Sequence, residues 1–175
     1  LEYSGQPIDF TAVFGRAATL VFEIGFGNGD HLLARAMNEP GTNFLGAEVH
    51  RPGAGRLIHR ADDAGLKNLR VISHDAVEVL RDCIAPEGLS QVVIQFPDPW
   101  HKKRHHKRRL IQPEFARLLA SRIRSGGELQ LATDWAEYAE HMLVVLNAEP
   151  AFRKQAADGR SVPQPVTSLR TKFDR

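Results

Sequence analysis

Three glycines alternate with other residues in the segment Glu23–Gly29, which reads EIGFGNG. Glycine lets the backbone turn tightly and approach a ligand closely, so this segment is a candidate binding loop. An acidic residue, Glu48, lies 23 positions after Gly25. A carboxylate at this separation is placed to hydrogen-bond both hydroxyls of an adenosine ribose. The pattern therefore predicts a ligand that contains adenosine.

The spacing of the glycines distinguishes two ligands of this kind. Gly25, Gly27 and Gly29 follow G-x-G-x-G, whereas the loop that binds a dinucleotide pyrophosphate follows G-x-G-x-x-G. Glu23 would repel a pyrophosphate but attract the sulfonium and ammonium groups of S-adenosylmethionine (SAM). We therefore predict SAM and disfavour a nicotinamide dinucleotide. The structural alternative for Glu23 is a partner of the helix dipole or a helix cap.

Two further acids allow both a structural and a functional interpretation. Asp75 and Asp134 are each followed three residues later by a glutamate, a pattern typical of a helix N-terminus. Asp75 is also placed to accept a hydrogen bond from an adenine amino group. Asp134 remains open to a role in substrate binding.

The segment Phe96–Trp100 reads FPDPW and places Asp98 between two prolines. Proline fixes its own φ, so the carboxylate is held on a stiff backbone. A rigid carboxylate beside an aromatic ring suits a pocket for a base, and we predict a functional role for Asp98. Trp100 either stacks on a base or packs in the core.

Positive charge is concentrated in His101–Arg109, which contains six Lys or Arg residues and no acid. Without these six, 17 of the 23 basic side chains remain against 21 acidic ones, a balance of −4. Lys and Arg neutralise phosphates and release counterions, so the segment predicts a polyanionic partner. Its three histidines lack a Cys or carboxylate at metal-ligand spacing, and we predict no metal.

Alternating apolar and amphipathic runs must position these residues. Strands are predicted at 19–24, 43–49, 69–73, 90–96 and 128–133, and helices at 30–38, 55–64, 76–84, 115–124 and from Trp135 onward. The last helix is expected to bury Trp135, Tyr138, Ala139, Met142, Leu143 and Leu146. This order predicts an α/β, Rossmann-like fold with a mostly parallel sheet and helices on both faces. Ligands of such sheets bind beyond the carboxyl ends of the strands, where every candidate residue above lies.

Composition places the chain among ordinary globular proteins. It has 175 residues, 42% hydrophobic and 25% charged, which fits one domain with one core. The apolar runs are too short for a membrane span, and we expect no secretory leader. Cys83 is the single cysteine, so it is expected to be a buried apolar residue in a reducing cytoplasm.

From about Thr19 onward the chain resembles the bacterial, single-chain type of tRNA (guanine-N7)-methyltransferase. The motifs that carry the resemblance are EIGFGNG (23–29), EVH (48–50), HDAVEVL (74–80), FPDPWHKKRHHKRR (96–109), TDW (133–135) and TKFD (171–174). The resemblance implies a class I SAM-dependent methyltransferase that uses SAM, releases S-adenosyl-L-homocysteine, and acts on a variable-loop guanine of tRNA.

The resemblance also implies a role for individual residues, by position. Its SAM-binding residues fall on Glu23, Gly25, Gly27, Gly29, Glu48, Asp75 and Asp98, and its proposed catalytic residue is Asp98. Its substrate contacts fall on Lys102, Asp134, Thr171, Lys172, Phe173 and Asp174. Its RNA-interacting stretch falls on Arg104, His105, His106, Lys107, Arg108 and Arg109.

Guanine N7 has a lone pair and no proton, so no strong base is required. Asp98 is expected to orient the guanine or to offset the charge gained on methylation, and the base must be exposed or flipped. Relatives usually carry a basic amino-terminal arm and a further strand, so residues 1–175 are expected to be a single domain truncated at both termini. No membrane and no obligate protein subunit are expected. The alternatives are methylation of another RNA or of a protein, and non-catalytic RNA binding.

Overall fold

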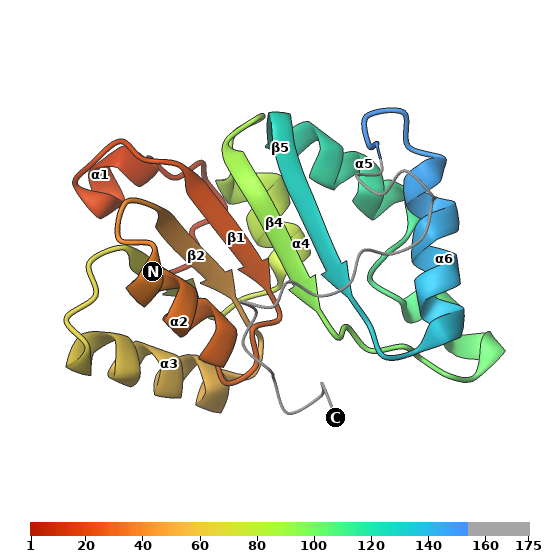
Figure 1. Ribbon diagram of the computed structural model, residues 1–175, viewed down its shortest axis with the longest axis horizontal. Coiled ribbons are helices and arrows are strands. Elements are labelled where there is room, and N and C mark those ends of the chain that lie inside the picture. The colour runs from red at the N-terminus through yellow and green to blue at the C-terminus, as the bar shows by residue number, and fades with distance from the viewer. Residues whose placement is uncertain (154–175) are drawn as a thin grey trace.

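Five strands form one parallel sheet in residues 1–153, the part of the chain that the computed structural model describes. They are β1 (Leu20–Ile24), β2 (Asn43–Ala47), β3 (Leu69–Ile72), β4 (Leu89–Gln95) and β5 (Ile123–Ala132). Their order is β3-β2-β1-β4-β5, with every neighbouring pair parallel (Figure 1). The order reverses between β1 and β4, which confirms the predicted class of fold and creates a switch point at their carboxyl ends.

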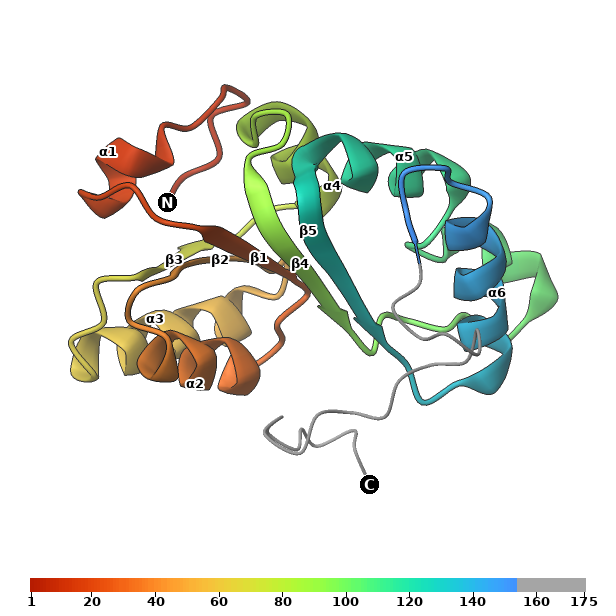
Figure 2. The same cartoon turned by 45° about the horizontal axis from the view of Figure 1, so that its top comes forward.

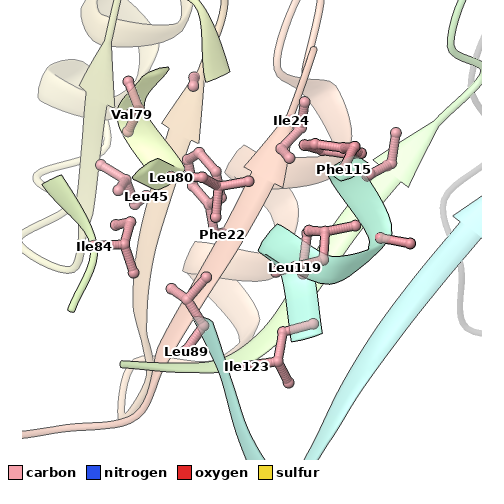
Figure 3. Close-up of a cluster of buried hydrophobic side chains, with 14 of the residues drawn as sticks. Phe22, Ile24, Leu45, Val79, Leu80, Ile84, Leu89, Phe115, Leu119 and Ile123 are labelled. Atoms are coloured by element: carbon pink, nitrogen blue, oxygen red, sulfur yellow. The ribbon is translucent and has the colours of Figure 1, made fainter. Parts of the chain in front are cut away.

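Helices cover both faces of the sheet (Figure 2). One apolar core joins the sheet to α2 (Asp30–Asn38) and α3 (Arg51–Asp63). The other core joins it to α1 (Phe10–Phe14), η1 (Val79–Cys83), which follows the short α4 (Ala76–Glu78), α5 (Pro113–Arg122) and α6 (Ala136–Asn147). Alternation along β1 places Val21 in the first core. It places Phe22 and Ile24 in the second core, which Figure 3 shows.

Three features differ from the sequence-based expectations. The predicted buried stripe of α6 is wrong at Trp135, which is 39% exposed, because the helix begins one residue later. Tyr138 and Met142 are buried as predicted, Ala139, Leu143 and Leu146 are half-buried, and Val145, which was not predicted, is buried as well. Strand β5 begins at Ile123 rather than Glu128, with a register shift opposite Leu89 and Gln91. The helix α1 and the 3-10 helix η2 (Lys103–Arg108) were not predicted.

The amino-terminal segment packs on η1 through polar and aromatic contacts. The Tyr3 ring stacks on His74 with 3.7 Å between ring centroids, and its hydroxyl donates to Asp82 Oδ2 at 2.6 Å. Cys83 is buried beside this contact, as expected. In the part of the chain described, no helix combines the length and hydropathy of a membrane span.

Candidate functional site

The predicted site residues gather at one edge of the sheet because parallel strands share the edge at which they end. The glycine loop Gly25–Gly29 follows β1, Glu48 follows β2, and Asp75 follows β3. The segment Phe96–Trp100 follows β4, and Asp134 follows β5. Figure 1 shows the arrowheads of β1, β4 and β5 pointing towards this edge.

The glycine loop is open on the side where a ligand would lie. Gly25 and Gly27 have φ values of 67° and 59°, a region that side chains disfavour, and no atom lies within 4 Å of where a Cβ would stand on either. A Cβ on Gly53 of α3 would lie 2.1 Å from the carbonyl oxygen of Gly27. The helix α3 therefore supports the loop from behind, a role for Gly53 that no local sequence pattern signals.

Glu48 holds the loop from the neighbouring strand. Its side chain is 9% exposed, and its two carboxylate oxygens accept the backbone N–H groups of Gly27 and His50, each at 2.8 Å. A carboxylate has about four acceptor positions, so ribose hydroxyls can still donate to it. The ribose contact stays a prediction, and the structure adds a role in shaping the loop.

Glu23 is buried under the loop and has a partner that the sequence did not reveal. It is 3% exposed, and its Oε2 lies 2.7 Å from Nδ1 of His31, itself buried in the first turn of α2. The N-cap of α2 is Gly29, without a side-chain bond, so Glu23 does not act as a helix cap. Once α2 is known to begin at Asp30, His31 is placed to face the end of β1.

The two acids with capping patterns behave differently. Asp75 is exposed and accepts the N–H of Val77 at 2.7 Å, which confirms its role as the N-cap of α4. The capping interpretation of Asp134 is wrong, because the N-cap of α6 is Trp135, whose N–H donates to Thr133 Oγ1 at 3.2 Å. Asp134 is exposed and accepts no hydrogen bond within residues 1–153. The substrate contact of Asp134 and the adenine contact of Asp75 stay predictions.

The Asp98 loop, residues Phe96–Trp100, is strained on both sides of its carboxylate. Phe96 and Trp100 have φ values of 50° and 48°, a region that costs a bulky residue roughly 1–3 kcal/mol and is common at functional sites. Asp98 is exposed and accepts no hydrogen bond from the described residues. Its carboxylate is therefore free to meet a ligand.

Trp100 lies outside both buried clusters, so core packing does not explain it. The guanidinium of Arg108 lies over its ring, 5.0 Å from the centroid, and the His105 ring is 6.0 Å away. The Trp100 ring thus supports η2, the short helix that carries most of the basic segment.

The basic segment, Lys102–Arg108, presents most of its charge to solvent. Lys102 caps η2 through its carbonyl, which accepts the N–H of His105 at 2.7 Å. The exposed cations are Lys102, Lys103, Arg104, Lys107 and Arg108, while His105 and His106 are half-buried. This geometry suits contact with phosphates, which stays a prediction.

Arg109 differs from its basic neighbours because it is only 3% exposed. Its Nε donates to the carbonyl oxygen of Pro99 at 2.8 Å, and its Nη2 lies 3.0 Å from His106 Nε2 and 3.3 Å from Glu137 Oε1. The guanidinium carbon lies 4.9 Å from the centroid of the Tyr138 ring. The guanidinium is thus engaged by the protein itself, and the contact of Arg109 with RNA stays a prediction.

Tyr138 completes the buried layer beneath the Asp98 loop. Its hydroxyl accepts the N–H of Ile111 at 3.2 Å. Burial raises the pKa of Tyr138, and the negative charge of Asp98 adds to that shift. The phenol therefore stays neutral over the physiological range, and α6 presents an uncharged ring to Arg109.

The remaining predicted residues, Thr171, Lys172, Phe173 and Asp174, lie outside the described residues. Within residues 1–153, no cluster of three His, Cys, Asp or Glu side chains is placed to hold a metal ion. The glycine loop and the carboxylates at this edge of the sheet fit SAM. The space over Gly25 and Gly27 is open, and the carboxylates of Glu23 and Glu48 suit a cationic nucleoside.

Known proteins resemble this chain in sequence. A family model described as "Putative methyltransferase" matches residues 17–175. The tRNA (guanine-N(7)-)-methyltransferase of Pseudomonas aeruginosa strain PAO1 is 53% identical over 175 residues, which cover 100% of this chain and 72% of that protein. The protein of the same name from Shewanella amazonensis is 52% identical over 174 residues, covering 99% of this chain and 73% of that protein.

Solved structures resemble it in fold. The 16S rRNA methyltransferase KamB has a TM-score of 0.60 at 15% identity, covering 82% of this chain and 74% of that chain. The precorrin-6y C5,15-methyltransferase of Geobacter metallireducens has a TM-score of 0.59 at 15% identity, covering 79% of this chain and 67% of that chain. At these identities the likeness shows a shared Rossmann-like methyltransferase fold.

Proposed function

This chain belongs to the tRNA (guanine-N7)-methyltransferase family, and we propose that it transfers a methyl group from SAM to N7 of a variable-loop guanine in tRNA. The observation that carries the proposal is the relatives' identity of about half over the whole chain. The glycine loop and Asp98 support it, because they end the adjacent strands β1 and β4 at one edge of the sheet.

The residues around the glycine loop bind the donor. Glu48 accepts hydrogen bonds from the ribose hydroxyls, and Glu23 offsets the positive charge of the methionine part. Asp75 accepts from the adenine amino group. When bound, SAM supplies an electrophilic methyl group, and S-adenosyl-L-homocysteine is the product.

Asp98 acts on the acceptor by position and charge. Guanine N7 attacks with its own lone pair, so the site needs no residue to remove a proton before the methyl group is transferred. The ring becomes positively charged in this step, and a nearby carboxylate stabilises that charge. The carboxylate of Asp98 is exposed and accepts no hydrogen bond from residues 1–153, which suits this role better than that of a buried base.

The basic segment and Asp134 bind the tRNA. The exposed cations of Lys102–Arg108 contact phosphates, and Lys102 and Asp134 contact the substrate near the reacting base. The enzyme works in the cytoplasm, where its tRNA substrate is found, and it needs no second protein subunit.

Methyl transfer from labelled SAM to an unmodified tRNA transcript tests the function. The matched control is the same transcript with its variable-loop guanine replaced by adenine. We expect label in the first transcript only. Label in both would remove the proposed site of methylation, and label in neither would overturn the proposed activity.

A further inference from the structure

We propose that Arg109 is a positioning residue that holds the Asp98 loop in its reactive shape, and that it makes no contact with tRNA phosphate. The inference rests on the proposed function, since it assigns Asp98 a role at the reacting guanine. It separates Arg109 from the run of cations in which the sequence places it.

Arg109 connects three segments of the chain that meet beside the site. Its Nε donates to the Pro99 carbonyl in the loop after β4, and its Nη2 contacts His106 of η2. The same Nη2 lies 3.3 Å from Glu137 of α6, and the guanidinium covers the Tyr138 ring. A planar guanidinium suits these contacts because its donors point in fixed, divergent directions.

The Asp98 loop needs hydrogen bonds from outside the loop to fix its backbone. Two of its five residues are prolines, which have no N–H, so the loop has few donors with which to fix itself. Its first residue is anchored by the Phe96 N–H, which donates to the Ala132 carbonyl of β5 at 2.8 Å. The Arg109 contact at 2.8 Å anchors the Pro99 carbonyl on the other side of Asp98.

Backbone strain at the loop also indicates that contacts from outside hold its conformation. Left-handed φ values at Phe96 and Trp100 persist only where the surroundings hold the chain against relaxation. Both strained residues lie next to an anchored group, the Phe96 N–H itself and the Pro99 carbonyl before Trp100. If the Arg109 anchor is lost, the carboxylate of Asp98 is expected to move, and misplacement by about 1 Å can cost up to roughly a hundredfold in rate.

The substitution Arg109→Lys separates the two roles. A lysine keeps the charge, so a phosphate contact would survive, but its single ammonium cannot reproduce the contacts to Pro99, His106 and Glu137 together. We expect kcat at saturating SAM and tRNA to fall about ten- to a hundredfold. The slope of log K for tRNA binding against log salt concentration should stay at its wild-type value.

Two further variants serve as controls for kcat and for the salt slope. Lys107→Ala removes an exposed cation of the basic segment and should make the salt slope shallower by roughly 0.7–0.9. Arg117→Lys changes an exposed arginine of α5 that has no partner among the described residues, and should change neither quantity. A wild-type kcat in Arg109→Lys would overturn the proposal. A second substitution, Arg109→Gln, removes the charge, and a shallower salt slope for tRNA binding in that variant would also overturn it.

A double-mutant cycle with Asp98→Asn excludes a general loss of stability, with rates taken below the lowest melting temperature. If Arg109 acts through Asp98, Arg109→Lys should cost much less in kcat in the Asp98→Asn background. Additive effects would contradict the proposal even if the variant is less stable. If the wild-type protein bound tRNA without methylating it, the proposed function would fail, and the salt slope of Arg109→Gln would still decide whether Arg109 contacts phosphate.

Discussion

At the residue scale, the two buried carboxylates of the proposed SAM site, Glu23 and Glu48, have different partners. Glu48 uses both oxygens to hold backbone N–H groups, so its charge is stabilised before any ligand binds. The Glu23 carboxylate contacts the imidazole of His31, and both side chains are buried. Removal of that imidazole is therefore expected to leave the buried Glu23 carboxylate without this hydrogen bond.

His31→Leu is expected to leave Glu23 buried without its hydrogen-bond donor. The free energy of unfolding should fall by about 1–3 kcal/mol, and the affinity for S-adenosyl-L-homocysteine should fall with it. His31→Asn keeps an N–H donor near the Nδ1 position. It should retain most of the stability and most of the affinity for S-adenosyl-L-homocysteine. Urea denaturation and calorimetric titration measure them, and equal losses in the two variants would contradict a role through the hydrogen bond.

Asp98→Asn removes a charge without removing a hydrogen bond made by the described residues. Stability should be unchanged, because the side chain is exposed. Turnover of bound tRNA should fall about tenfold or more, because the amide does not offset the charge on the methylated guanine. Single-turnover methyl transfer measures this step, and an unchanged rate would show that the charge of Asp98 does not matter.

At the element scale, the donor site depends on how closely α3 approaches the loop after β1. Gly53 allows this approach, because any Cβ there would overlap the Gly27 carbonyl. The same helix contains Gly55, around which no atom lies within 4 Å of a Cβ position. The two glycines therefore provide a matched pair in one helix.

Gly53→Ala should displace the glycine loop and raise the dissociation constant of S-adenosyl-L-homocysteine by at least tenfold. Gly55→Ala should leave binding unchanged and stabilise the protein by about 0.5–1 kcal/mol, because alanine favours helix over glycine. Calorimetric titration and thermal melting distinguish them. Similar binding by both variants would show that the loop tolerates movement of α3.

The hydrogen-bonded carboxylate of Asp82 in η1 makes stability depend on pH. The hydrogen bonds from Arg81 first, and from Tyr3 second, lower the pKa of Asp82 from 3.8 to about 2. A lowered folded-state pKa gives stability that is present above pH 3.8 and is lost as the pH falls towards 2. Asp82→Asn should flatten this part of the profile, measured as the urea midpoint from pH 5 to pH 2, and parallel profiles would refute the assignment.

The placement of the glycine loop and of Glu48 at the ends of their strands was predictable because the signals are local. Glycines between an apolar run and an amphipathic run fix the loop, and Glu48 follows from the next apolar run. Arg109 was not predictable, because six cations in one segment look alike until the position of α6 is known. His31 and Gly53 were missed because their partners, Glu23 and Gly27, contact them only after α2 and α3 pack on the sheet.

At the scale of the whole molecule, donor binding joins segments that are far apart in the chain. The proposed SAM contacts come from the ends of β1, β2 and β3, and Asp98 extends them to β4. A ligand that spans these strand ends stabilises the native state over the unfolded one, because the unfolded chain has no such site.

S-adenosyl-L-homocysteine should therefore raise the melting temperature. At about 100 times its dissociation constant, the gain in free energy of unfolding is roughly 2.7 kcal/mol. NAD at the same concentration should cause no shift, because Glu23 disfavours a pyrophosphate. Differential scanning fluorimetry measures both, and a shift with NAD alone would favour a dinucleotide site.

The central position of β1 also affects how the protein is made. Its second neighbour, β4, pairs Gln91 with Val21, so 70 residues separate the partners. At about 5–20 residues per second, a ribosome needs roughly four to fourteen seconds to extend the chain from the end of β1 to the end of β4. During that interval one edge of a fully buried strand has no native partner, and the nascent chain is exposed to pairing with other chains. Slow codons between β3 and β4 should therefore lower the soluble yield more than slow codons after β5.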